Sequence, residues 1–227
     1  MIVTPTTLAA LAGRPVNDNM RSAVAGLVKH SAGLELPHRL ALFLGQTAEE
    51  SLGWEYDHEL WGPTKAQLSY EGRRDLGNTQ PGDGFKFHGR GPMETTGRAN
   101  YALFTAWAKG IDPNAPDFTV DPDAMTTDPW EGLSAVWFWE SRNLNALADA
   151  GDILGITHRV NGGENGLAER IRLSVAAGLL LLGYASVRAF QYAHGLDADG
   201  VAGHLTQAML HKALMAAPPV TFAMEAA

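Results

Sequence analysis

The sequence predicts a mainly α fold, and three observations support this prediction. Apolar residues recur with helical spacing in most segments of the chain. Residues that favour helix N-caps precede several of these segments, and glycines that favour helix ends follow them. Only one long stretch, 53–91, departs from the pattern, because it is rich in Gly, Pro, Asp and Asn. The expected fold is therefore mainly α with a small irregular or β-hairpin insert.

Three helices are expected before the insert, at 4–11, 18–32 and 37–51. In the third, Leu40 and Phe43 belong to an apolar stripe with helical spacing, so one face of this helix should lie in the core. Within the insert, residues 77–84 read GNTQPGDG and carry several turn signals in a row. A long irregular insert in a helical domain is usually functional.

The end of the insert has a different pattern. Phe85 and Phe87 alternate with Lys86 and His88 between glycines, which predicts one arm of a short hairpin. Further helices are then expected at 97–109, 129–150, 153–160 and 167–184. The aromatic group of the second of these, Trp130, Trp137, Phe138 and Trp139, is expected in the core.

A shift in composition near Tyr184 divides the chain into a main domain, 1–184, and a helical appendage, 185–227. Residues 187–214 suggest a helix, a glycine-rich turn and a second helix, followed by an Ala- and Pro-containing tail that we expect to be loosely ordered. A length of 227 residues suits one sizeable domain with a short appendage. We expect a monomer.

Charge and composition argue against several kinds of partner. A formal net charge of -8 disfavours nucleic acid and anionic membranes. The longest apolar stretch, 173–185, is shorter than the roughly 20 residues that span a bilayer, so no membrane insertion is expected. The chain has no cysteine, and its 8 histidines lack metal-site spacing, so we expect neither metal nor cofactor. The first residues do not resemble a secretory signal, which predicts folding in a cytoplasm.

Acidic residues gather where the third helix ends and the insert begins: Glu49, Glu50, Glu55, Asp57 and Glu59. Hydrolysis of a glycosidic bond needs a proton donor and a second carboxylate. On a helix, Glu50 projects roughly 70° from the centre of the apolar stripe and Glu49 roughly 170°. Glu50 is therefore half turned toward the core and is our candidate general acid, whereas Glu49 should face water. The alternative is that these acids form a solvated surface.

Three segments resemble the family 19 glycoside hydrolases, and specifically their bacterial and phage endolysin branch. They read FLGQTAEESLGW, YEGRRDLGNTQPGDGFKFHGRGPMETTGRANY and ITHRVNGGENGLAERI, and they occur in the family's order within about residues 42–182. The resemblance implies a lysozyme-like fold of two lobes with a cleft between them. It also implies an inverting reaction, in which two carboxyl groups stand roughly 6.5–9.5 Å apart with a water between them.

The resemblance also assigns roles to individual residues. Glu50 matches the catalytic acid, Glu59 the second carboxylate, and Thr96 the hydroxyl residue that helps to hold the attacking water. The residues matching the sugar-binding cleft and the surroundings of the catalytic centre are Asn100, Asn161 and Arg170. Glu55 and Glu71 are the alternatives to Glu59.

Two residues depart from the family's pattern. Glu49 stands where relatives commonly have histidine, and Glu94 stands where they commonly have glutamine. A carboxylate at position 94 could favour the protonated form of the catalytic acid, or it could point elsewhere.

Other residues of the insert are candidates for substrate binding. Trp54, Tyr56 and Trp61 lie near the acids and could stack on sugar rings. Arg90 belongs to the one locally basic stretch and could contact an acidic wall polymer, although a structural ion pair is an equally reasonable role.

The expected function is hydrolysis of β-1,4 bonds in the peptidoglycan glycan strand by an endolysin of muramidase (lysozyme) type. Such a protein would accumulate in the host cytoplasm and reach the wall at lysis. A chitinase acting on N-acetylglucosamine polymers and a non-catalytic wall-binding protein are the alternatives. The appendage resembles the second half of a peptidoglycan-binding module, which could add wall affinity or only pack on the catalytic domain.

Overall fold

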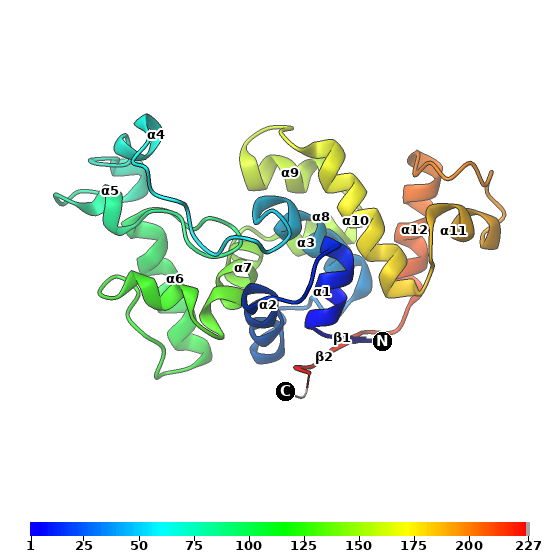
Figure 1. Cartoon of the computed structure of the whole chain (residues 1–227), viewed down its shortest axis with the longest axis horizontal. Helices are drawn as coiled ribbons and strands as arrows, with labels where there is room; N and C mark the ends of the chain where they lie inside the picture. Colours follow the sequence, from blue (N-terminus) through cyan, green and yellow to red (C-terminus); the bar gives the residue numbers. More distant parts are fainter. Residues whose placement is uncertain (226–227) are drawn as a thin grey trace.

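The computed structural model describes residues 1–225 and is mainly helical, which confirms the predicted fold class (Figure 1). The helices are α1 (Pro5–Ala12), α2 (Asp18–Lys29), α3 (Pro37–Glu50), α4 (Lys65–Leu68), α5 (Asp83–Lys86), α6 (Arg98–Ile111), α7 (Trp130–Ser141), α8 (Leu144–Asp149), α9 (Ile153–Asn161), α10 (Leu167–Leu182), α11 (Val187–Ala193) and α12 (His204–Ala216). Two short 3-10 helices, η1 (Arg74–Leu76) and η2 (Pro122–Thr126), and two parallel strands, β1 (Ile2–Val3) and β2 (Thr221–Phe222), complete the fold.

Two lobes are visible in Figure 1, one containing α4, α5 and α6 and the other containing α1, α3, α9 and α10, with α7 between them. In the second lobe α3 packs along α10, and α2 packs along α7. These contacts are close because glycines lie in them: a Cβ on Gly45 of α3 would stand 2.0 Å from Ser174 Oγ of α10. A Cβ on Gly26 of α2 would likewise stand 2.5 Å from the Gly132 backbone of α7. The glycines thus fix how the helices that carry the site are spaced.

The expected helix at 129–150 is interrupted. Asn143 adopts a left-handed backbone conformation with φ 52°, which ends α7 and starts α8. The aromatic group of α7 is buried as predicted, with Trp139 only 1% exposed and its ring edge-on to Phe43 of α3.

The prediction that residues 85–88 form one arm of a hairpin is wrong. Phe85 lies in α5, whose first residue, Asp83, accepts hydrogen bonds from the backbone N–H groups of Thr79 and Gln80 and so stabilises a helical turn. Antiparallel bridges occur instead between His58 and Arg90 and between Arg90 and Thr95, so a tight turn after Arg90 replaces the expected arm.

The carboxyl-terminal segment packs on the rest of the chain. Leu210 and Leu214 of α12 are buried, and a Cβ on Gly178 of α10 would contact both side chains. The expectation of a loosely ordered tail is wrong for its described part, because β2 pairs with β1 and Val220 N–H donates to the Glu35 carbonyl. The last two residues, 226–227, lie outside the described part, and the boundary near Tyr184 stays a prediction.

Within residues 1–225, no single helix has both the length and the apolar character to cross a membrane, and only α10 and α11 together, bent by 57°, reach that length and composition.

Candidate functional site

Glu50 is the last residue of α3 and is half-buried, with 22% of its side chain exposed. Its carboxylate accepts a hydrogen bond from Nη2 of Arg170 on α10, whose side chain is only 4% exposed. The structure therefore places Glu50 at the margin of the core, where the helical geometry predicted it, and brings Arg170 to the same point.

The same arginine connects α3 and α10 a second time. Arg170 Nη1 donates to Gln46 Oε1 at 2.6 Å, and its Nε donates to the Asn165 carbonyl at 3.3 Å. Gln46 is fully buried one turn before Glu50 and donates to Thr157 Oγ1 of α9. Three helices thus hold the guanidinium group, and through it the carboxylate of Glu50.

Glu49 is half-buried and so faces water less fully than expected. A Cβ on Gly166, just before α10, would stand 2.3 Å from Glu49 Oε1, so the side chain lies against the start of that helix. Burial raises the pKa of Glu49. The position of Glu49 on its own helix could not predict this contact, because α10 is distant in the sequence.

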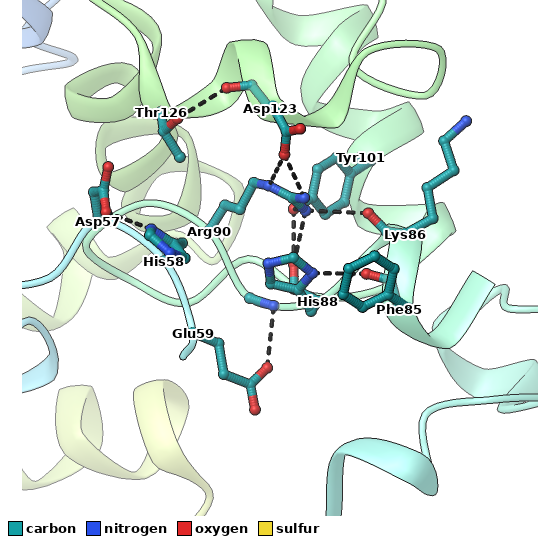
Figure 2. Close-up of polar contacts among 11 residues, drawn as sticks. Asp57, His58, Glu59, Phe85, Lys86, His88, Arg90, Tyr101, Asp123 and Thr126 are labelled. Carbon is teal, nitrogen blue, oxygen red and sulfur yellow. Dashed lines mark hydrogen bonds and ion pairs between the residues drawn. The ribbon is translucent and has the colours of Figure 1, made fainter. Parts of the chain in front are cut away.

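Glu59 lies on the insert, on the segment that pairs with Arg90 through His58. Its backbone N–H donates to the Gly89 carbonyl at 2.9 Å, and the Gly89 N–H donates to Glu59 Oε2 at 3.3 Å (Figure 2). The Tyr70 hydroxyl donates to Glu59 Oε1 at 3.3 Å. Backbone pairing and two neutral donors therefore position this carboxylate, whereas an arginine positions Glu50.

The two alternatives to Glu59 are engaged elsewhere. Glu55 is exposed and forms an ion pair with Arg14. Glu71 accepts the backbone N–H groups of Gly82 and Gly84, both at 2.8 Å, and so stabilises the turn before α5. Neither carboxylate is free to face Glu50.

Glu94 occupies the turn between the bridged residues Arg90 and Thr95, with a left-handed φ of 51°. Burial, followed by the negative charges of Glu59 and Glu50, raises the pKa of Glu94 to about 7. Both proposed catalytic acids thus lie near enough to act on this third carboxyl group. We call Glu50, Glu59 and Glu94 the carboxyl cluster.

Two residues predicted from the family pattern hold the turn of Glu94. Thr96 Oγ1 donates to the Glu94 carbonyl at 2.8 Å, and Asn100 Nδ2 donates to the Thr96 carbonyl at 2.7 Å. Thr96 Oγ1 also lies beside Gly89, since a Cβ there would be 3.3 Å away. The structure thus brings Thr96 to the Glu59 side of the cluster, and its role toward water stays a prediction.

A hollow of about 410 Å³ adjoins Glu59, within the size range of small-ligand sites. It is lined by Trp61 and by Asp57, His58, Glu59, Phe85, His88, Arg90, Asp123 and Thr126, which are labelled in Figure 2. The rings of Trp61, Phe85 and His88 stand 5.1–5.7 Å apart, centroid to centroid, and form an aromatic side of the hollow.

Burial lowers the pKa of His88, so this ring is neutral at neutral pH. Sequence reasoning missed Phe85 and His88, because it assigned both residues to a hairpin.

Arg90 forms part of the wall of this hollow, but its N–H groups are already used. Nε and Nη2 donate to Asp123 Oδ1 at 3.0 and 2.6 Å, and Nη1 donates to the Tyr101 hydroxyl at 2.8 Å (Figure 2). With 5% of the residue exposed, Arg90 shapes the hollow as the structural ion pair that was the alternative prediction.

The remaining predicted residues differ in their surroundings. The prediction that Trp54 stacks on a sugar is wrong, because its side chain is 1% exposed and packs in the core. Tyr56 is 40% exposed and stays a prediction. Asn161 ends α9, where its side chain donates to the Asn165 carbonyl at 2.7 Å and accepts from the Gly163 N–H at 2.8 Å. It therefore orders the loop before α10, and its contact with substrate stays a prediction.

Among the described residues, no group of three His, Cys, Asp or Glu side chains is arranged to hold a metal ion.

Comparison with known proteins gives similar sequences over part of the chain. A glycosyl hydrolase family 19 domain-containing protein of Haemophilus influenzae is 35% identical over 109 residues, 48% of this chain and 49% of that protein. An acidic endochitinase of Petunia hybrida is 36% identical over 103 residues, 44% of this chain and 34% of that protein. The matches thus span half or less of the length of these relatives. No family model matches the chain.

Solved structures extend the likeness in fold. Chitinase C of Streptomyces griseus superposes with a TM-score of 0.59 at 17% identity, over 79% of this chain and 76% of that one. A bacterial family 19 chitinase gives a TM-score of 0.59 at 18% identity, over 79% of this chain and 95% of that one. The two-lobed helical fold expected from the sequence is therefore the fold of these proteins.

Proposed function

From the premise that this chain belongs to the family 19 glycoside hydrolases, we propose that it hydrolyses β-1,4 glycosidic bonds of bacterial peptidoglycan. The observation that carries the proposal is the carboxyl cluster, in which Arg170 of α10 holds Glu50, Gly89 and Tyr70 hold Glu59, and both acids lie near enough to Glu94 to add to the rise in its pKa that burial causes. Two carboxyl groups on opposite sides of a cleft are what acid and base catalysis of this reaction requires.

In the proposed mechanism Glu50 donates a proton to the glycosidic oxygen as the bond to the anomeric carbon breaks. Glu59 takes a proton from a water molecule, which attacks that carbon from the opposite face and inverts its configuration. Arg170 stabilises the negative charge left on Glu50 after donation, through the hydrogen bond present in the structure. Gly89 and Tyr70 keep the base in place through their donors to Glu59.

The hollow beside Glu59 is the proposed site for one part of the glycan strand. Its aromatic side, Trp61, Phe85 and His88, offers faces for sugar rings, and its size suits a small ligand. The resemblance of the sequence segments to phage endolysins favours peptidoglycan as substrate and a role in host lysis, with the protein held in the host cytoplasm until then. The appendage that includes α11 and α12 is proposed to add affinity for the wall.

Chitin is the second candidate substrate. It is favoured because the plant relatives are named endochitinases and the structural neighbours are chitinases. Both polymers contain β-1,4-linked N-acetylated amino sugars, so the same acid and base would serve either one.

Product analysis separates these functions. The wild type, Glu50→Gln and Glu55→Gln are each incubated with purified peptidoglycan and with chitin oligomers, and the products are identified by mass spectrometry. We expect muropeptides from peptidoglycan with the wild type, a loss of at least about 100-fold with Glu50→Gln, and the wild-type rate with Glu55→Gln, whose carboxylate is exposed and pairs with Arg14.

Each other outcome identifies an alternative. Release of chitin fragments alone would establish the chitinase. Wall pull-down without product from either polymer would establish the non-catalytic wall-binding protein, and unchanged hydrolysis by Glu50→Gln would remove Glu50 as the acid.

A further inference from the structure

Glu94 has an unusual place in the carboxyl cluster. It is a non-glycine residue with a left-handed backbone in the turn after Arg90. Its carboxyl group packs against Gly89, where a Cβ would stand 2.1 Å from Glu94 Oε2. The N–H of the same glycine donates to Glu59 Oε2. Glu59 and Glu94 are therefore neighbours of one residue, and only a glycine leaves room for both.

The charged groups that act on Glu94 are all acidic. They are Glu50 at the end of α3 and Glu59 and Asp57 on the insert. Two titratable hydroxyls lie nearby, those of Tyr70 on the insert and Tyr101 on α6. Burial is the main cause that raises the pKa of each, so both are neutral in the working range of pH. The cations on the packed elements are engaged: Arg170 of α10 pairs with Glu50, and Arg90 pairs with Asp123.

Ionisation of Glu94 would therefore place a second negative charge beside Glu59 without a counter-ion. Like charges at short range in a half-buried site repel strongly. Glu59 can relieve the repulsion by leaving its hydrogen bond with Gly89, which at 3.3 Å is long. A neutral carboxylic acid at position 94 removes this repulsion, as the neutral amide of the family's usual glutamine does.

We propose that Glu94 is a positioning residue that works as a neutral carboxylic acid, keeping Glu59 beside Gly89, and that its loss of a proton turns the enzyme off at alkaline pH. The proposal rests on the proposed glycosidase function. Burial and the surrounding carboxylates raise the pKa of Glu94 to about 7, so the switch would operate near neutrality.

The pH profile of kcat tests this proposal, with each variant normalised to its own maximum. For the wild type we expect kcat to fall about tenfold per pH unit above the midpoint of the alkaline limb, with a smaller change in KM because the base and not the binding surface is displaced. Glu94→Gln, which cannot ionise, should move this midpoint upward by about one pH unit or more. Glu94→Asp keeps an ionisable group and should keep an alkaline limb, and Glu55→Gln should leave the wild-type limb in place.

A second measurement follows the carboxyl group directly. NMR titration of the protein labelled with ¹³C at the glutamate side-chain carboxyl carbons should show a resonance that titrates near pH 7 in the wild type and is missing in Glu94→Gln, while the resonance of the buried Glu131, whose pKa burial raises to about 8, remains in both. An unchanged alkaline limb in Glu94→Gln, or the absence of that resonance from the wild type, would overturn the proposal. If neither polymer is cleaved, the proposed function fails, and the titration alone decides whether Glu94 keeps its proton.

Discussion

The α3 side and the insert side of the carboxyl cluster hold their acids in opposite ways. On the α3 side, Glu50 is paired with a buried arginine that is itself held by Gln46. On the insert side, the donors to Glu59 among the described residues are neutral, and Glu94 lies beside it with a pKa raised to about 7 by burial and by neighbouring carboxylates. Among the described residues, one carboxylate therefore has a cation as its hydrogen-bond donor, and the other has a phenol and a backbone N–H group. This difference suits a reaction in which Glu50 gains a charge as Glu59 loses one.

Removing the arginine should have the largest effect. Arg170→Ala leaves the half-buried Glu50 without its cation and the fully buried Gln46 Oε1 without its donor. We expect a loss of stability of about 3 kcal/mol and a loss of activity of about 100-fold or more. Urea unfolding and rates on the preferred polymer measure the two effects.

Arg170→Lys is the matched control, because it keeps the charge and loses the planar group that reaches Gln46 and Glu50 together. It should recover part of the activity. If Arg170→Ala were as active as the wild type, the two sides of the cleft would not differ in the way described.

Glu131 on α7 is a second buried carboxyl group whose pKa is raised, as that of Glu94 is. It is 2% exposed, its Oε1 has no hydrogen-bond partner among the described residues, and burial followed by the charge of Asp57 raises its pKa to about 8. In the unfolded chain this carboxyl ionises near its ordinary pKa of 4.5. The stability it contributes is therefore fully present below about pH 4.5 and is lost as pH rises toward 8.

Glu131→Gln removes this titration. Its free energy of unfolding should exceed that of the wild type by about 2 kcal/mol at pH 8 and by much less at pH 5, as measured by urea unfolding at both values. Asp197→Asn, at an exposed position of the appendage, should change neither value. Equal gains at both pH values would show that packing, and not ionisation, is responsible.

The sequence predicted what depends on local pattern. Helical spacing placed Glu50 at the edge of the core, and the family segments brought Arg170 and Thr96 to the site. It failed where distant parts of the chain decide the outcome: Glu49 is covered by the start of α10, and Trp54 is buried in the core. Phe85 lies in α5, and Phe85 and His88 line the hollow, because Asp83 binds the preceding turn and Arg98. Alternation of apolar residues could not reveal that contact.

The smallest expected effect concerns Tyr70, which sharpens the description of the insert side. Burial raises the pKa of Tyr70, so its phenol keeps its proton and remains a donor to Glu59 throughout the working range of pH. Tyr70→Phe removes one of the two neutral donors that position Glu59 and leaves Gly89 in place. We expect kcat to fall about two- to tenfold, which corresponds to one hydrogen bond of about 0.5–1.5 kcal/mol, with KM nearly unchanged.

Because Glu59 is then held less firmly against the charge of Glu94, the alkaline limb of the kcat profile should also begin at a lower pH. A fall in KM alone, or no change in either constant, would mean that the backbone of Gly89 positions the base without the tyrosine.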